Sequence, residues 1–251
     1  MNRKLGKKPP RHDDRTLKFA RYLRPEAELP KIPDSADWSA KVRHWGMMEN
    51  DRLGDCTIAA AGHMIQTWSA NDGPAEIVVP DEDIVKVYMR VTGGRDEGAV
   101  MLDVLKDWRK LGINGHFIEM FMALNPKMLD YVHAALDIFG GVYVGLNLPA
   151  FVEKIPTGQV WDLPEERAKD GSDEPGSWGG HAVCGEAYSV NEHLISVVTW
   201  GAVQPMSAAF FLAYCDECYA VLSKDWFGAD NRCPSGFDLQ AAQEDLLIVS
   251  R

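Results

Sequence analysis

The fold of this chain is decided by one stretch, Glu49-Asn50-Asp51-Arg52-Leu53-Gly54-Asp55-Cys56-Thr57-Ile58-Ala59-Ala60-Ala61-Gly62-His63-Met64-Ile65-Gln66. A polar loop leads to Cys56, and the small and apolar residues after it predict a buried helix. A helix N-terminus favours an anion, so we predict a lowered thiol pKa at Cys56. Asn50 could add a side-chain donor for the oxygen of a tetrahedral intermediate. On this stretch alone, a reactive nucleophile and an inert core cysteine are equally good interpretations.

Composition and charge narrow the class of protein. The chain has 251 residues, 46% of them hydrophobic, which supports one large domain or two small lobes. It has no apolar run long enough for a membrane span and no signal peptide, so we predict a cytoplasmic protein without a membrane partner. Export by another route and association with a virion stay open.

The first 31 residues differ in charge from the rest of the chain. Residues 1–31 carry ten basic and four acidic side chains, whereas the whole chain has a net charge of −11. We predict a solvated basic arm, with a role in tethering a partner as the alternative. The acidic body argues against nucleic acid as that partner, because it repels phosphate.

Hydrophobic periodicity divides the chain into a mainly helical half and a β-rich half. A long insertion between residues 149 and 180 contains an acidic stretch, which we predict to be a solvated loop; its charges could also attract basic residues of a substrate. Helices are predicted from residue 56 and near residues 81–89, 100–111 and 128–139, and strands near 141–148, 182–188, 194–200, 218–222 and 246–249.

Two histidines are candidate bases for Cys56. His63 lies two helical turns away, about 10 Å along the axis, which is too far for proton transfer. His181 lies where the insertion meets a predicted strand, so it can face a cleft and accept the Cys56 proton. Trp200, at the end of the next predicted strand, could shield this imidazole from water.

Four motifs in this order resemble those of the papain-like cysteine peptidases. The resemblance covers about residues 32–251 and is to a divergent member of bacterial or phage type. The motifs are Pro33 with Asp37-Trp38, Asn50 ahead of Gly54-Asp55-Cys56, Gly180-His181-Ala182-Val183 with Gly185 and Tyr188, and Trp200-Gly201.

The resemblance implies an α+β, papain-like fold of two lobes with the active-site cleft between them. A helical lobe would span about residues 32–127 and a β-barrel-like lobe residues 128–251, after the arm of residues 1–31. The implied activity is hydrolysis of a peptide or protein substrate by acyl transfer through Cys56 and His181, with Asn50 at the oxyanion and with no cofactor or metal. The implied substrate-binding residues are Gly93, Gly94, Gly98 and Trp200.

Departures from the family bear on activity. Aligned on Trp200-Gly201, the residue that orients the imidazole falls on Val198, which cannot accept a hydrogen bond, and a regular strand turns Thr199 to the opposite face. We also expect residues 1–31 to be too few to occupy the whole cleft as an inhibitory propeptide does. The alternative function is a catalytically weak or inactive papain-like binding or structural module tethered by its basic arm. Acyl transfer to an amine, as in transglutaminases, is a third possibility.

The other four cysteines admit three states. Cys215, Cys218 and Cys233 are one ligand short of a zinc site unless a histidine or Cys184 joins them. A chain without a signal peptide favours reduced thiols. A disulfide and a zinc site remain as alternatives.

Overall fold

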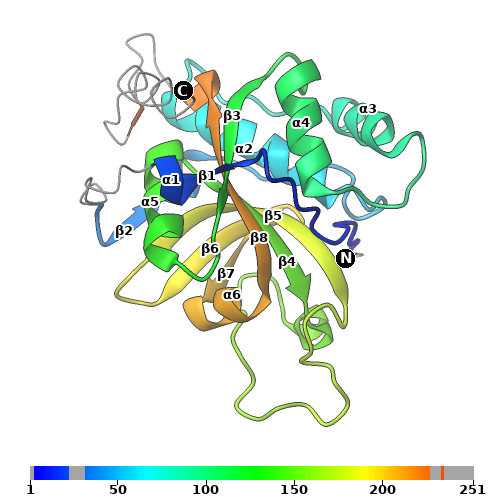
Figure 1. Ribbon diagram of the computed structural model, residues 1–251, viewed down its shortest axis with the longest axis vertical. Helices are drawn as coiled ribbons and strands as arrows, with labels where there is room; N and C mark the ends of the chain where they lie inside the picture. The colour runs from blue at the N-terminus through cyan, green and yellow to red at the C-terminus, as the bar shows by residue number, and fades with distance from the viewer. Residues whose placement is uncertain (1–2, 23–31, 227–232, 235–251) are drawn as a thin grey trace.

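One curved sheet of eight strands forms the frame of the chain (Figure 1). The structure is a computed structural model and describes residues 3–22, 32–226 and 233–234. The strand order is β1-β3-β8-β4-β5-β6-β7, and β2 pairs with β5. The strands are β1 (Leu17–Lys18), β2 (Ser35–Asp37), β3 (Ile118–Leu124), β4 (Val142–Leu148), β5 (Gly179–Ser189), β6 (Leu194–Thr199), β7 (Ala202–Ser207) and β8 (Cys215–Ser223).

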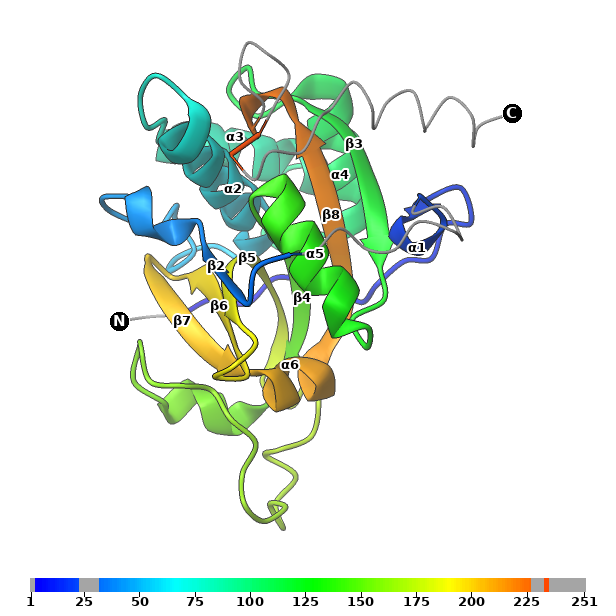
Figure 2. The same ribbon diagram turned by 90° about the vertical axis from the view of Figure 1, so that its left-hand side faces the viewer.

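Helices pack against this sheet. Helix α2 packs on β5, and α5 packs on β8, β4 and β5, lying along the sheet in Figure 2. Among the described helices, none combines the length and the apolar character that crossing a bilayer requires. The helices are α1 (Phe19–Tyr22), α2 (Cys56–Asp72), α3 (Asp81–Thr92), α4 (Met101–Leu111), α5 (Leu129–Phe139) and α6 (Ala208–Tyr214), with short 3₁₀ turns at Ser39–Lys41, Ala150–Lys154 and Lys224–Trp226.

Helix α2 is buried on all sides, as its small and apolar residues predict. Every residue from Cys56 to Ser69 is buried. Gly62 lets the neighbouring segments approach closely, because an added Cβ would lie 2.6 Å from Met48 Sδ and 2.8 Å from Ile84 Cδ1 of α3. The helix therefore holds Cys56, its first residue, at a fixed place inside the molecule.

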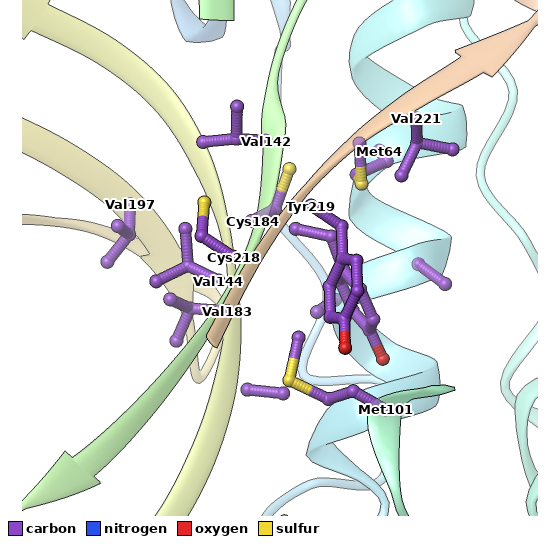
Figure 3. Close-up of a cluster of buried hydrophobic side chains, with 14 of the residues drawn as sticks. Met64, Met101, Val142, Val144, Val183, Cys184, Val197, Cys218, Tyr219 and Val221 are labelled. Atoms are coloured by element: carbon purple, nitrogen blue, oxygen red, sulfur yellow. The ribbon is translucent and has the colours of Figure 1, made fainter. Parts of the chain in front are cut away.

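The hydrophobic core lies between the helices and the sheet. Figure 3 shows Met64 of α2 and Met101 gathered with side chains of β4, β5, β6 and β8 in one buried cluster. Strand β4 lies at the centre of the sheet. Its sequence is almost entirely apolar because both faces of the strand are covered. This core fixes β5, the strand that carries His181.

The structure confirms the α+β class and adds strands that the sequence did not predict. Strand β3 was not expected, and it adds a strand from within the predicted helical lobe, as β2 does. Strand β1, from the predicted solvated arm, pairs with β3. The lobe boundary near residue 127 stays a prediction, and the strand predicted at residues 246–249 lies outside the described residues.

Candidate active site

Cys56 begins α2 and lies against the start of β5. The N–H of Ala182, the residue after His181, donates a hydrogen bond to Cys56 Sγ at 3.4 Å. The thiol is 1% exposed and the imidazole of His181 is fully buried. Helix α2 and strand β5 thus bring the predicted nucleophile and the predicted base to the same place.

Thr199 contacts the imidazole of His181. The expectation that the Thr199 side chain points to the opposite face of the strand is therefore wrong. Thr199 Oγ1 lies 2.6 Å from His181 Nε2. The strand register explains this, because Cys184 pairs with Val198. Cys184 is three residues after His181 and so points to the opposite face, which places Thr199 on the face of His181. His181 Nδ1 has no hydrogen-bond partner and is left to accept a proton.

Trp200 covers the imidazole. Its ring stacks on His181 with centroids 4.2 Å apart and an interplanar angle of 14°. Trp200 and Gly201 have φ angles of 46° and 73° and form the two-residue turn between β6 and β7. This turn projects the indole over His181, and Trp200 Nε1 donates to the carbonyl of Lys4 at 3.2 Å. Trp200 therefore contacts both His181 and the N-terminal segment.

That N-terminal segment occupies the cleft, and the expectation of a solvated arm is wrong for residues 3–8. Lys7 N–H donates to Gly180 O at 3.0 Å on one side. On the other side, Ala99 N–H donates to Gly6 O at 2.8 Å and Lys8 N–H donates to Ala99 O at 2.9 Å. In Figure 1 this dark-blue segment crosses the front of the molecule on its way to β1. We call residues 3–8 the cleft segment.

Close backbone contacts depend on glycines on both sides of the cleft segment. A Cβ added to Gly6 would lie 1.7 Å from the carbonyl oxygen of Gly54. A Cβ added to Gly98 would lie 2.2 Å from the carbonyl oxygen of Gly6, and one added to Gly180 would lie 2.2 Å from that of Lys7. No side chain fits at these distances. Gly98, which was predicted to contact substrate, and the motif glycines Gly54 and Gly180 here accommodate residues 6 and 7 of the chain itself.

The predicted lowering of the thiol pKa does not hold with the cleft segment in place. Burial raises the pKa of Cys56 to about 12 and outweighs the hydrogen bonds from Ala182 and Gly6. Burial lowers the pKa of His181 to about 3, and the charges of Arg3 and Lys7 lower it further. Near neutral pH the pair is therefore a neutral thiol beside a neutral imidazole.

Asn50 is buried beside the nucleophile and holds the loop before α2. Its Nδ2 donates to Leu53 O and to Asp55 Oδ1, both at 3.1 Å. Burial raises the pKa of Asp55 to about 8, so this carboxyl group is mainly protonated at neutral pH. Both N–H groups of Asn50 are engaged here, and its role at the oxyanion stays a prediction.

The Gly-rich connector contributes unequally to the cleft. Gly98 contacts the cleft segment, whereas Gly93 and Gly94 form the left-handed end of α3 and have no atom within 4 Å of an added Cβ. Asp96, which the sequence did not single out, links the loop before α2 to helix α3. Its Oδ1 accepts from Gly54 N–H at 2.9 Å and from the Tyr88 hydroxyl at 2.7 Å. The roles of Gly93 and Gly94 in substrate binding stay predictions.

The remaining candidates lie outside this site. His63 Nε2 lies 3.0 Å from Gly46 O, so this imidazole holds the loop that contains Gly46. Cys56, Cys184, Cys215 and Cys218 are buried, free thiols. Within the described ranges, no group of three or more His, Cys, Asp or Glu side chains is arranged to hold a metal ion.

Solved structures of cysteine proteases share this fold. Xylellain, a cysteine protease from Xylella fastidiosa, matches with a TM-score of 0.68 at 16% identity, over 88% of this chain and 98% of its own. Procathepsin B from Trypanosoma congolense matches with a TM-score of 0.59 at 12% identity, over 88% and 87%. A Carica candamarcensis cysteine protease matches with a TM-score of 0.54 at 12% identity, over 76% and 99%. No model of a protein family and no curated protein sequence matches the chain. The chain thus has the fold of the papain-like cysteine proteases.

Proposed function

We propose that this chain is a cysteine peptidase whose resting form is covered by its own N-terminus. One observation carries the proposal: the cleft over Cys56 and His181 holds an extended peptide, residues 3–8, by main-chain hydrogen bonds on both sides. Main-chain hydrogen bonds do not depend on the side chains of the peptide. The same groups would hold a substrate once the cleft segment withdraws.

Cys56, His181 and Thr199 each have a role in acyl transfer. His181 Nδ1 accepts the thiol proton of Cys56 while Thr199 holds Nε2. The sulfur attacks the substrate carbonyl carbon, and backbone N–H groups at the start of α2 stabilise the resulting oxyanion. The imidazolium then protonates the leaving amine as the C–N bond breaks, which leaves a thioester. Water attacks the thioester with His181 as base, releasing the acid and restoring the thiol.

The cleft segment explains why the resting form would be inactive without being cleaved. The Gly6 N–H forms a hydrogen bond with Cys56, so the segment turns an amide hydrogen toward the sulfur. The raised pKa of Cys56 and the lowered pKa of His181 both follow first from burial. Withdrawal of the segment admits water and removes the largest cause of both shifts.

Gly6→Ala in the full chain tests this proposal. The added methyl would lie 1.7 Å from the Gly54 carbonyl oxygen, so the cleft segment cannot dock. We expect iodoacetamide to alkylate Cys56 in this variant at least about tenfold faster than in wild type at pH 6. Adding His181→Ala should remove the part of the gain that comes from the thiolate–imidazolium pair and leave only the part that comes from exposure of the thiol. The Gly6→Ala protein should hydrolyse unstructured protein substrates.

Two controls separate the outcomes. Lys4→Ala changes the same segment at an exposed side chain and should behave as wild type, because the Lys4 contacts with Asn50 and Trp200 are made by its main chain. Cys56→Ala in the Gly6→Ala background should lose hydrolysis. If the Gly6→Ala thiol titrates near the ordinary value of about 8.5 and no substrate is cleaved, the peptidase proposal is wrong and a binding or structural module is favoured.

A further inference from the structure

A lysine of the cleft segment is buried in a pocket next to the candidate active site. The Lys7 side chain is fully covered. Its Nζ lies 2.9 Å from Asp216 Oδ2 and 3.4 Å from Glu217 Oε1, and it donates to Lys8 O at 3.4 Å. A lysine is seldom covered this completely unless its charge is paired. We call this space the Lys7 pocket.

The backbone of the sheet shapes the pocket for a long side chain. Gly145 of β4 pairs with Glu217 of β8 at a point where the register shifts. An added Cβ on Gly145 would lie 2.7 Å from Lys7 Cε, 2.6 Å from Glu217 Cγ and 2.8 Å from Met101 Sδ. The glycine thus leaves the space that the lysine methylenes fill, and any larger residue would close it.

The carboxylates at the end of the pocket call for a cation. Glu217 is 6% exposed, and Tyr219 fixes it by donating from its hydroxyl to Oε2 at 2.9 Å. Asp216 Oδ1 and Glu217 Oε1 are buried without a hydrogen-bond partner. Burial raises the pKa of Glu217, and the ammonium of Lys7 opposes that rise. A neutral side chain in this place would leave the buried Glu217 and the half-buried Asp216 without a compensating charge.

We propose that the Lys7 pocket is the specificity subsite of the cleft and selects a basic side chain from the substrate. This inference rests on the proposed peptidase function. Main-chain groups of Gly180 and Ala99 hold the backbone around Lys7. The same groups would hold the backbone of a substrate. A substrate residue bound between them would therefore direct its side chain into the Lys7 pocket. Lys7 is then a stand-in for the substrate side chain in the resting form.

Peptide pairs that differ only in this charge test the inference. In full-length Gly6→Ala protein, we compare kcat/KM for peptides with lysine or norleucine at each position in turn. At one position we expect lysine to be preferred on the order of a hundredfold, because norleucine has the same stem but leaves the carboxylates unpaired. Arginine should also be accepted there, and glutamate should be refused.

A matched pair of variants assigns the preference to the pocket. Glu217→Gln and Asp216→Asn should each reduce the ratio of lysine to norleucine at that position, and together bring it near one. Glu192→Gln removes an exposed carboxylate elsewhere and should leave the ratio unchanged. Labelling of Cys56 in each variant checks that the cleft is intact. Cleavage without a lysine preference, or a preference that survives both substitutions, overturns the subsite while leaving the peptidase function standing. An absence of any cleavage instead counts against the proposed function.

Discussion

A hydroxyl group orients the imidazole of His181. The 2.6 Å contact between Thr199 Oγ1 and His181 Nε2 leaves Nδ1 as the free nitrogen. In the Gly6→Ala background, Thr199→Val keeps the branched shape but removes this contact, so we expect kcat/KM to fall roughly tenfold or more. Thr199→Ser restores the hydroxyl and should restore most of the rate.

The pH profile separates positioning from packing at this residue. A loss of orientation should shift the acidic limb of kcat/KM, because the contact stabilises one form of the imidazole. If Thr199→Val has the same rate and pH profile as the parent Gly6→Ala protein, or if Thr199→Ser is as poor as Thr199→Val, the hydroxyl does not act through His181.

Glu186 is a buried acid that couples stability to pH. It is fully buried beside the Cys184 thiol, which donates to its Oε1, and burial raises its pKa from 4.5 to about 8. Between these values the folded state binds more protons than the unfolded state. The stabilising contribution is therefore complete below pH 4.5 and is lost as the pH rises through 8.

Glu186→Gln should remove this dependence. We expect the free energy of unfolding of wild type, relative to the variant, to fall by about 1.4 kcal/mol for each pH unit within that window. Urea unfolding of both proteins at several pH values between 5 and 8 measures the difference directly. Asp55, whose pKa is raised likewise, is present in both proteins and cancels. A difference that stays constant with pH would contradict the raised pKa of Glu186.

At the scale of elements, the sequence predicts best where composition and packing agree. Helix α2 could be predicted because small and apolar residues on every side fit a buried helix and little else. Strand β3 could not, since Ile118–Leu124 contains one β-branched residue and is rich in methionine. Its pairing with β8 imposes the strand conformation, and such a pairing is invisible in the local sequence.

The same limit explains the two misjudged parts of the site. Cys56 and His181 could be found because each stands in a short motif. Thr199 was missed because its direction depends on how β5 and β6 are registered. The cleft segment was missed because main-chain hydrogen bonds hold it, and these leave almost no trace in side-chain composition. The one sequence signal was the glycine at position 6, which close backbone approach requires.

Across the whole molecule, the cleft segment and a substrate compete for the same groups. Whatever weakens docking of residues 3–8 must favour substrate binding by the same free energy, since the two are linked through one cleft. The two ion pairs of the cleft segment contribute unequally to the free energy of docking. Lys7 is paired in a covered pocket, whereas Lys8 pairs with Glu97 at the surface, where salt screens it. Lys7 should therefore dominate the electrostatic part of docking.

Hydrogen exchange can measure this competition residue by residue. The reporters are the amides of Lys7, Lys8 and Ala99, whose hydrogen bonds exist only while the segment is docked. Lys7→Ala removes the buried charge, so in the full-length protein we expect the Lys8 and Ala99 amides to exchange at least about tenfold faster than in wild type. Lys4→Ala removes an equal charge from an exposed side chain and should leave these amides unchanged.

Amides within β4 provide the internal reference for the same experiment. Their hydrogen bonds to β5 and β8 do not depend on the cleft segment, so their exchange should be equal in all three proteins. Faster exchange in β4 of Lys7→Ala would mean general destabilisation rather than undocking. Equal exchange of the Ala99 amide in Lys7→Ala, Lys4→Ala and wild type would mean that the Lys7 pocket does not hold the segment. The selective result would mean that one buried ion pair controls access to Cys56 and His181.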